Sequence, residues 1–165
     1  MKAYFLALIG GQLFGLRKES VAGIGTRDER KVKPVEENGK KLLPLPDGNF
    51  AVICDLLPLL GGGEGGHARQ SHYLIVTHQG QLIALVMSGK GRLVMMDASS
   101  PSPLPLAFNP LARGLIPGVL TNCTDLILLL DLEILATVPD RMASRNSYDQ
   151  KVLLENGAGE RDNDE

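Results

Sequence analysis

The sequence predicts a mainly β fold that consists of two small, fused β-barrels, and three observations lead to this prediction. The chain of 165 residues contains 19 glycines and 10 prolines, an excess that favours many turns between short strands over a helical bundle. A hairpin-like segment occurs twice, at residues 4–16 and 73–85, and an apolar segment that contains one Asp occurs twice, at 50–59 and 126–135. Two barrels that share a core explain this duplication better than one open sheet, because closure removes exposed strand edges.

The repeated hairpin segment is the most informative pattern in the chain. The stretches YFLALIGGQLFGL at Tyr4–Leu16 and YLIVTHQGQLIAL at Tyr73–Leu85 are identical at five of thirteen positions. In each copy an apolar run is followed by a turn centred on glycine, which is Gly10-Gly11 in the first copy and Gln79-Gly80 in the second. A second apolar run then returns, so each copy predicts a β-hairpin.

The second repeated segment joins a short apolar run to an aspartate. FAVICDLLPL at Phe50–Leu59 aligns with LILLLDLEIL at Leu126–Leu135, and Asp55 then corresponds to Asp131. A run of five apolar residues suits a strand that is covered on both sides. Because the N–H groups at the start of a helix lack partners, each Asp is expected to cap a short helical turn that follows.

The polar stretches suggest how the chain is divided. Thr26–Lys41 carries six basic and four acidic residues and is expected to be a solvated loop or a ragged hairpin. Gly61–Ser71 (GGGEGGHARQS) reads as a flexible linker between the two repeats. One domain of two barrel subdomains is predicted over residues 1–138. The polar, acidic segment 139–165 is expected to be disordered, with a short helix at Tyr148–Glu155 as its one regular element.

Composition excludes several classes of protein. The 17 Lys and Arg residues and 19 Asp and Glu residues nearly balance, and the chain has seven aromatic residues and no Trp. Such a chain is not expected to bind nucleic acid or an acidic membrane surface. The apolar runs at 4–16 and 126–138 are interrupted or too short to be a signal peptide or a membrane span. Two distant cysteines favour a reduced, cytoplasmic location without direct membrane insertion.

Two patterns that suggest a bound group have simpler explanations. Gly61–Gly66 matches G-x-G-x-x-G, but a helical turn precedes it and a polar stretch follows, whereas a dinucleotide site needs a strand before and a helix after. The histidines at 67, 72 and 78 are spaced by five and six residues without a nearby cysteine or acidic cluster, which does not fit a metal shell. No cofactor and no metal are therefore predicted.

No catalytic residue is predicted either. Cys54 lies within an apolar run and is expected to be a buried, inert thiol. Cys123 follows Asn122 in a turn-like stretch without an adjacent His. No Ser/His/Asp order or pair of carboxylates stands out. An enzyme that acts through the Cys123 thiol is the least favoured of three functional hypotheses.

The order of these elements resembles the CheW-like family, the adaptor domains of bacterial chemotaxis arrays. Residues 4–24 resemble that family's opening hairpin and its V-x-x-I strand, and residues 50–60 (FAVICDLLPLL) are similar to its I-V-P-V-V-D-L-R segment. Residues 73–94 resemble its central hairpin and the following strand, and residues 116–135 its final I-x-G and L-L-L-D segment. The resemblance covers about residues 3–138 and rests on the order and number of apolar patterns.

This resemblance implies two five-stranded, SH3-like barrels around one core and a non-catalytic adaptor function. Such an adaptor couples the cytoplasmic tip of methyl-accepting chemoreceptors to the regulatory domain of a CheA-like histidine kinase through protein–protein contacts. Carried over by position, Val21 and Ile24 would line the partner groove, with Leu93 and Val94 facing them. The alternative for all four residues is ordinary barrel core, because apolar strand residues usually pack inside.

One segment departs from the family. Its G-x-x-N-L-R-G motif is replaced here by Leu42–Gly48 (LLPLPDG), so that Gly48 remains and Asp47 stands at the position of the partner-binding Arg. An anion in place of a cation repels a carboxylate that the Arg would bind. The second functional hypothesis is therefore a CheW-like scaffold in another signalling or array-positioning complex, which does not couple receptor to kinase.

Overall fold

The computed structural model describes residues 1–28, 31–60, 72–97, 100–122 and 124–157, and it confirms the mainly β prediction. The ten strands are β1 (Lys2–Ile9), β2 (Gln12–Arg17), β3 (Val21–Thr26), β4 (Val35–Glu37), β5 (Lys40–Pro44), β6 (Phe50–Cys54), β7 (His72–His78), β8 (Gln81–Met96), β9 (Gly118–Asn122) and β10 (Asp125–Leu129). The helices are two 3₁₀ turns, η1 (Lys18–Ser20) and η2 (Leu57–Leu60), and two α-helices, α1 (Pro110–Leu115) and α2 (Leu132–Gly157). The linker predicted at 61–71 lies outside the described residues.

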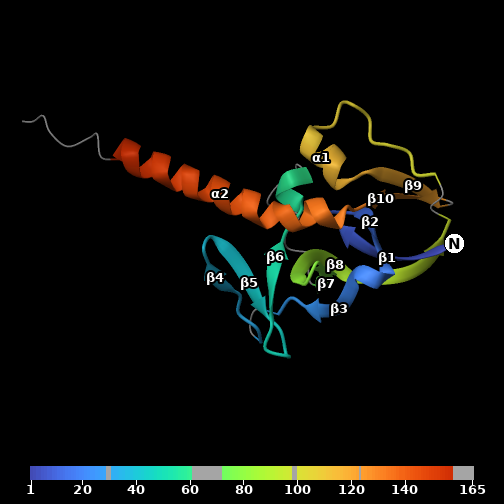
Figure 1. Cartoon of the computed structure of the whole chain (residues 1–165), viewed down its shortest axis with the longest axis horizontal. Helices are drawn as coiled ribbons and strands as arrows, with labels where there is room; N and C mark the ends of the chain where they lie inside the picture. Colours follow the sequence, from blue (N-terminus) through green and yellow to red (C-terminus); the bar gives the residue numbers. More distant parts are fainter. Residues whose placement is uncertain (29–30, 61–71, 98–99, 123, 158–165) are drawn as a thin grey trace, which may run out of the picture.

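The long strand β8 joins the two halves of the sheet (Figure 1). Its first part pairs with β7 and β6, and its second part pairs with β1. The β7 half contains β3 to β7, and the β1 half contains β1, β2, β9 and β10. Within the second part, at the register shift between Ser88 and Arg92, Gly91 has a φ of +67°, and a Cβ there would lie 2.5 Å from the Phe5 ring. Glycine is required where β8 crosses so close to β1.

The two closed barrels are not confirmed. The hydrogen-bonded order runs β4-β5-β6-β8-β1-β2-β10-β9, and β3 joins it through β7. In the part of the chain that the structure describes, no pairing links the ends of this order, so the sheet is open. The sequence argument for closure was that edges are a liability, but it could not show which edges the fold leaves uncovered.

Both predicted hairpins are confirmed. β1 pairs with β2 through Gly10-Gly11, and β7 pairs with β8 through Gln79-Gly80. All four turn residues have positive φ, which is the backbone form that matches the twist of two-residue hairpins.

Both predicted aspartate caps are also present. The Asp55 carboxylate accepts a hydrogen bond from the Leu57 backbone N–H at 3.0 Å, at the start of η2. The Asp131 carboxylate accepts from the N–H groups of Glu133 and Ile134, at 2.8 and 3.1 Å. The strands before them, β6 and β10, each form a parallel pair, with β8 and with β2.

The largest core cluster lies between the two halves and is shared by them. Phe14 comes from β2, Leu85 from β8, and Leu135 and Val138 from the first turns of α2, and all four are buried. Each half also has a smaller cluster of its own, one around Tyr73 and one around Tyr4. The shared core predicted from the duplication is therefore present.

Helix α2 runs through the predicted domain boundary at residue 138. It leaves the sheets as a projecting rod (Figure 1), and Lys40 on β5 forms an ion pair with Asp140 on its third turn. The segment from residue 139 thus begins as a continuation of the helix that Asp131 caps. The division into a domain and a disordered tail stays a prediction, and residues 158–165 lie outside the described part.

Candidate functional site

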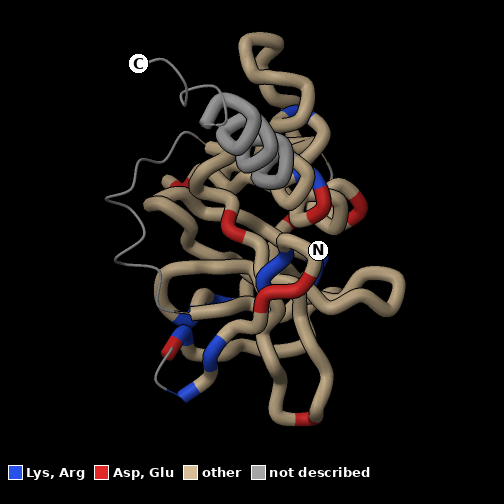
Figure 2. The backbone as a smooth tube through the Cα atoms, turned by 90° about the vertical axis from the view of Figure 1, so that its left-hand side faces the viewer, with Lys and Arg blue, Asp and Glu red and all other residues tan. Residues whose placement is uncertain are grey.

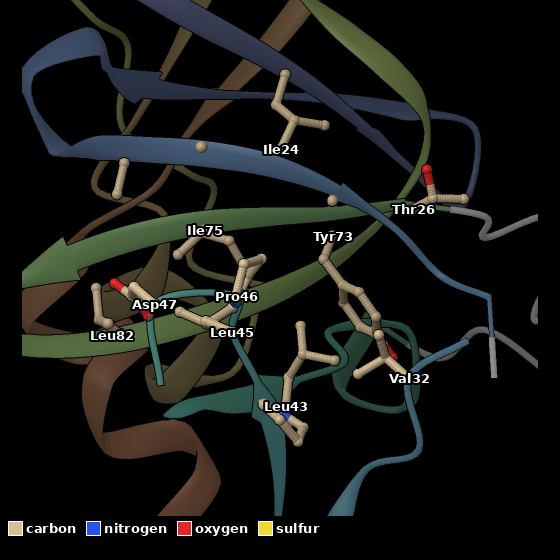
Figure 3. A pocket seen from close by; sticks show the side chains of 14 residues that line it. Ile24, Thr26, Val32, Leu43, Leu45, Pro46, Asp47, Tyr73, Ile75 and Leu82 are labelled. Carbon is tan, nitrogen blue, oxygen red and sulfur yellow. The ribbon is translucent and has the colours of Figure 1, made fainter. Parts of the chain in front are cut away.

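The main hollow of interest, which we call the β3 groove, lies in the β7 half between β3 and the β5–β6 turn (Figure 3). Its volume is about 480 Å³. It is lined by Ala22, Gly23, Ile24, Gly25, Thr26, Val32, Leu43, Pro44, Leu45, Pro46, Asp47, Tyr73, Ile75 and Leu82. Within this set only Asp47 carries a charge, so the groove is an apolar surface with one anionic position.

The floor of the β3 groove is the inner face of the open sheet. Leu43, Tyr73 and Ile75 are buried, Leu82 is half-buried, and all four belong to the small cluster of the β7 half or pack against it. Because this sheet does not close, the cluster can be reached from the side of β3. A partner that enters here would remove apolar surface from water.

Asp47 is held in a tight turn at one end of the groove. Its carboxylate accepts hydrogen bonds from the backbone N–H of Asn49 at 3.0 Å and from the Asn49 side-chain amide at 2.9 Å. The backbone hydrogen bond, followed by the side-chain one, lowers the pKa of Asp47 from its usual value. Gly48 follows with a φ of +86°, which favours glycine. Asp47 is therefore a fixed, ionised carboxylate at the rim.

The structure separates the other predicted partner residues. Ile24 lies on β3 with 47% of its surface exposed, whereas Val21 on the same strand packs against the shared core. Leu93 is 54% exposed on the second part of β8, and Val94 packs against the small cluster of the β1 half. Ile24 and Asp47 thus meet at the β3 groove, while Val21, Leu93 and Val94 do not line it. A partner-binding role for each of these residues stays a prediction.

The sequence argument missed the groove floor. Tyr73, Ile75 and Leu82 were read only as strands of the second hairpin, and Leu43 as part of an altered motif. One signal was available in Val21–Thr26 (VAGIGT), where two glycines alternate with apolar residues in a strand. Glycine inside a strand often marks the close approach of another backbone.

The described cysteine offers no reactive thiol. Cys54 is buried, and burial, together with the neighbouring Asp55 charge, raises its pKa to about 12. The thiol is neutral near pH 7 and cannot act as a nucleophile. Cys123 and His67, also considered from the sequence, lie outside the described residues.

The structure offers no metal position and no membrane span in the part that it describes. No three His, Cys, Asp or Glu side chains gather there into a potential metal site. His78 instead lines a separate polar hollow together with Lys2 and Arg17. None of the described helices is both long enough and apolar enough to cross a membrane.

Comparison with known proteins supports the fold but gives no sequence relative. Neither a protein-family model nor a curated protein matches the chain. Among solved structures, it is similar to the scaffolding protein TtCheW from Thermoanaerobacter tengcongensis, with a TM-score of 0.64 and 18% sequence identity. The match covers 79% of this chain and 84% of that protein. The chain therefore has the fold of this CheW scaffolding protein.

Proposed function

We propose that this protein is a non-catalytic, cytoplasmic adaptor in chemotaxis-type signalling. In this role it couples the cytoplasmic tip of a chemoreceptor to the regulatory domain of a CheA-like histidine kinase. The observation that carries the proposal is the similarity to a CheW scaffolding protein over 79% of the chain. The order of motifs along residues 3–138 supports the same family resemblance, including its two SH3-like subdomains built around a common core.

The surface of the molecule suits protein–protein contacts. Leu93 and Met95 are 54% and 60% exposed on the second part of β8, and Ile24 is exposed on β3. Large apolar side chains that stay exposed on rigid strands favour partner binding. The neutral, buried Cys54 and the absence of a metal cluster among the described residues give no support to an enzyme.

Calorimetric titration with the regulatory domain of a CheA-like kinase from the same genome tests the proposal. We expect binding in the micromolar range, and a second titration with the receptor tip should show binding as well. Leu93→Glu should weaken binding to one of these partners at least tenfold, because it places a charge on the proposed contact surface. Since the side chain is exposed, the charge should not disturb the core. Val21 is a poorer probe, because it packs against the shared core.

Leu126→Glu is the matched control for this test. Leu126 is 51% exposed and lies on β10, three strands away from β8 along the sheet. A charge there should leave both affinities unchanged. If neither the kinase domain nor the receptor tip binds the wild-type protein, receptor–kinase coupling is the wrong function.

The second candidate is a CheW-like scaffold that serves another signalling or array-positioning complex. The specific observation that favours it is Asp47, a fixed anion where the family carries an Arg. Under this candidate, Asp47→Arg should create binding to the kinase domain that the wild-type protein lacks. Asp47→Asn separates loss of the anion from gain of the cation, because it removes only the charge. Equal behaviour of both variants would show that the Arg itself is not needed.

A further inference from the structure

The first observation is that β3 has a free edge. Within the described residues, β3 pairs only with β7, from Val21↔Val76 to Thr26↔His72. Residues 22–26 of β3 line the β3 groove. Among the described residues, backbone partners other than β7 occur only at the ends of the strand, where the Val21 N–H donates to the Lys18 C=O and the Thr26 C=O accepts from the Asp28 N–H. Six residues of strand span roughly 20 Å. Such an edge is a template for one further strand.

The second observation is that neither backbone conformation nor a close contact among the described residues requires glycine at two positions of β3. Gly23 and Gly25 have no positive φ, and a Cβ added to either would meet no described atom within 4 Å. They lie opposite Ile75 and Tyr73 in the register with β7. Opposite residues share a face of the sheet, so side chains at 23 and 25 would project over the groove floor. Glycine keeps this space open at some cost to the strand.

The third observation concerns charge at the two ends of the groove. Asp47 and Leu82 lie toward one end, and Thr26 and Val32 toward the other (Figure 3). Lys31 and Lys33 flank Val32, and Lys and Arg gather beside the grey gap at residues 29–30 (Figure 2). The Arg27 Nε is shielded from solvent and has no hydrogen-bond partner among the described residues. One end is therefore anionic. At the other end Asp28 pairs with Lys31 at 3.9 Å, and Arg27 and Lys33 offer further donors.

We propose that the β3 groove binds an extended segment of a partner protein, which adds as a strand to the free edge of β3. Alternate side chains of this segment are apolar and rest on Tyr73, Ile75 and Leu43. A Lys or Arg of the segment reaches Asp47, and an acceptor such as a carboxylate lies near Arg27. A helical partner does not fit this edge, because its backbone groups are already paired within the helix.

The two longest segments outside the described residues have the wrong chemistry to be the occupant. Residues 61–71 (GGGEGGHARQS) and 158–165 (AGERDNDE) contain no large apolar side chain. An apolar groove floor gains nothing from either sequence. Neither segment is therefore the occupant, which we assign to a partner protein with an alternating apolar pattern and a cation at one end.

Selection from a displayed library of random octapeptides tests this proposal on the full-length protein. Peptides that bind the wild type but not Gly25→Val are collected, because Val at 25 fills the space above the groove floor. We expect a consensus with apolar residues at every second position and Lys or Arg at one end. The absence of any enrichment for such peptides would overturn the proposal.

Hydrogen exchange on the complex with a selected peptide shows how the peptide binds. Alternate amides between Val21 and Thr26 should exchange at least tenfold more slowly, as expected for amides that gain a strand partner. A peptide with proline at two central positions should not bind, because proline cannot donate to the ladder. Binding that leaves the β3 amides unprotected, or that survives central prolines, would contradict strand addition.

Two further variants separate this site from the proposed adaptor function. Leu126 is exposed on β10 in the β1 half and does not line the β3 groove. Leu126→Glu should leave peptide affinity unchanged, while Asp47→Asn should lower it several-fold. Thermal denaturation of Gly25→Val checks that the variant is folded. The peptide result stands whether or not a kinase domain or receptor tip binds, so failure of one proposal is distinguishable from failure of the other.

Discussion

The two halves of the molecule repeat the same elements but treat their outer strands differently. In the β1 half, the outer strand β9 is covered by its own chain. Ser102 and Val119 exchange two backbone hydrogen bonds at 2.9 and 2.7 Å. In the β7 half, the free edge of β3 has no such cover among the described residues. The comparison shows that a duplicated strand pattern determines the layout of a sheet but not which of its edges are covered.

The glycines beside these edges show the same contrast. A Cβ on Gly118 of β9 would lie 2.5 Å from the Cβ of Pro101, so the covering segment itself requires glycine there. A Cβ on Gly25 of β3 would meet no described atom within 4 Å. The first glycine is explained by a neighbour within the chain. The second has no such neighbour, and the strand-addition proposal supplies one.

The largest expected effect on stability is the difference between placing valine at Gly118 and placing it at Gly25. Gly118→Val should lower the free energy of unfolding by about 2 kcal/mol, because Pro101 must move to admit the side chain. Gly25→Val should change it by no more than about 0.5 kcal/mol, because the space is open and valine favours strands. Urea denaturation of both variants provides the measurement. Similar losses in the two variants would show that β3 is as tightly covered as β9.

A pH effect distinguishes the halves at a second pair of positions. Cys54 in the β7 half corresponds to Leu130 in the β1 half, and both are buried. Since burial raises the Cys54 pKa from 9.0 to about 12, the thiol stays neutral in the folded state while it ionises in the unfolded state above pH 9. The stability that it contributes is complete below pH 9 and is lost as pH rises toward 12, by about 1.4 kcal/mol per pH unit.

Cys54→Leu makes the two positions alike and should remove this part of the pH dependence. Urea denaturation at pH 8 and pH 10 measures the difference between wild type and variant. The wild type should lose about 1.4 kcal/mol more than Cys54→Leu between these two values. An identical loss in both proteins would show that the thiol is not shielded from water.

The smallest expected effect concerns the two aspartate caps. Asp131→Ala should lower the free energy of unfolding by about 1 kcal/mol, because its carboxylate caps two N–H groups of a helix that packs on the shared core. Asp55→Ala should cost about 0.5 kcal/mol, because one N–H of a four-residue 3₁₀ turn is affected. Thermal denaturation followed by far-ultraviolet circular dichroism gives both values. The reverse order would mean that η2 matters more to the core than α2.

The sequence predicts the local features of this fold well. The hairpin turns at Gly10-Gly11 and Gln79-Gly80 and the caps at Asp55 and Asp131 follow from residues that are neighbours in the chain. Closure of the barrels was not confirmed, because it depends on strand edges that meet only in three dimensions. A short helix was expected at Tyr148–Glu155, but its continuity with the Asp131 cap as one helix, α2, was not expected, since the composition beyond residue 138 is polar.

The candidate site was predicted less completely than the fold. Asp47 and Ile24 lie at the β3 groove, but the residues of its floor were read only as strand interior. Val21 and Ile24 look equally apolar in sequence, yet one packs on the core and the other is exposed. Alternation alone cannot tell which face of a strand is covered when both faces carry apolar residues. Which face is covered depends on the neighbouring strands.

The 16-residue strand β8 has a consequence for how the protein unfolds. Since its two ends belong to different halves, neither half keeps all its hydrogen bonds when the other opens. The shared core cluster strengthens this dependence, because it draws residues from both halves. The halves are therefore coupled into one cooperative unit, and they should melt together in a single transition despite their repeated pattern. The amides at the centre of β8 should be the last in the protein to exchange with solvent.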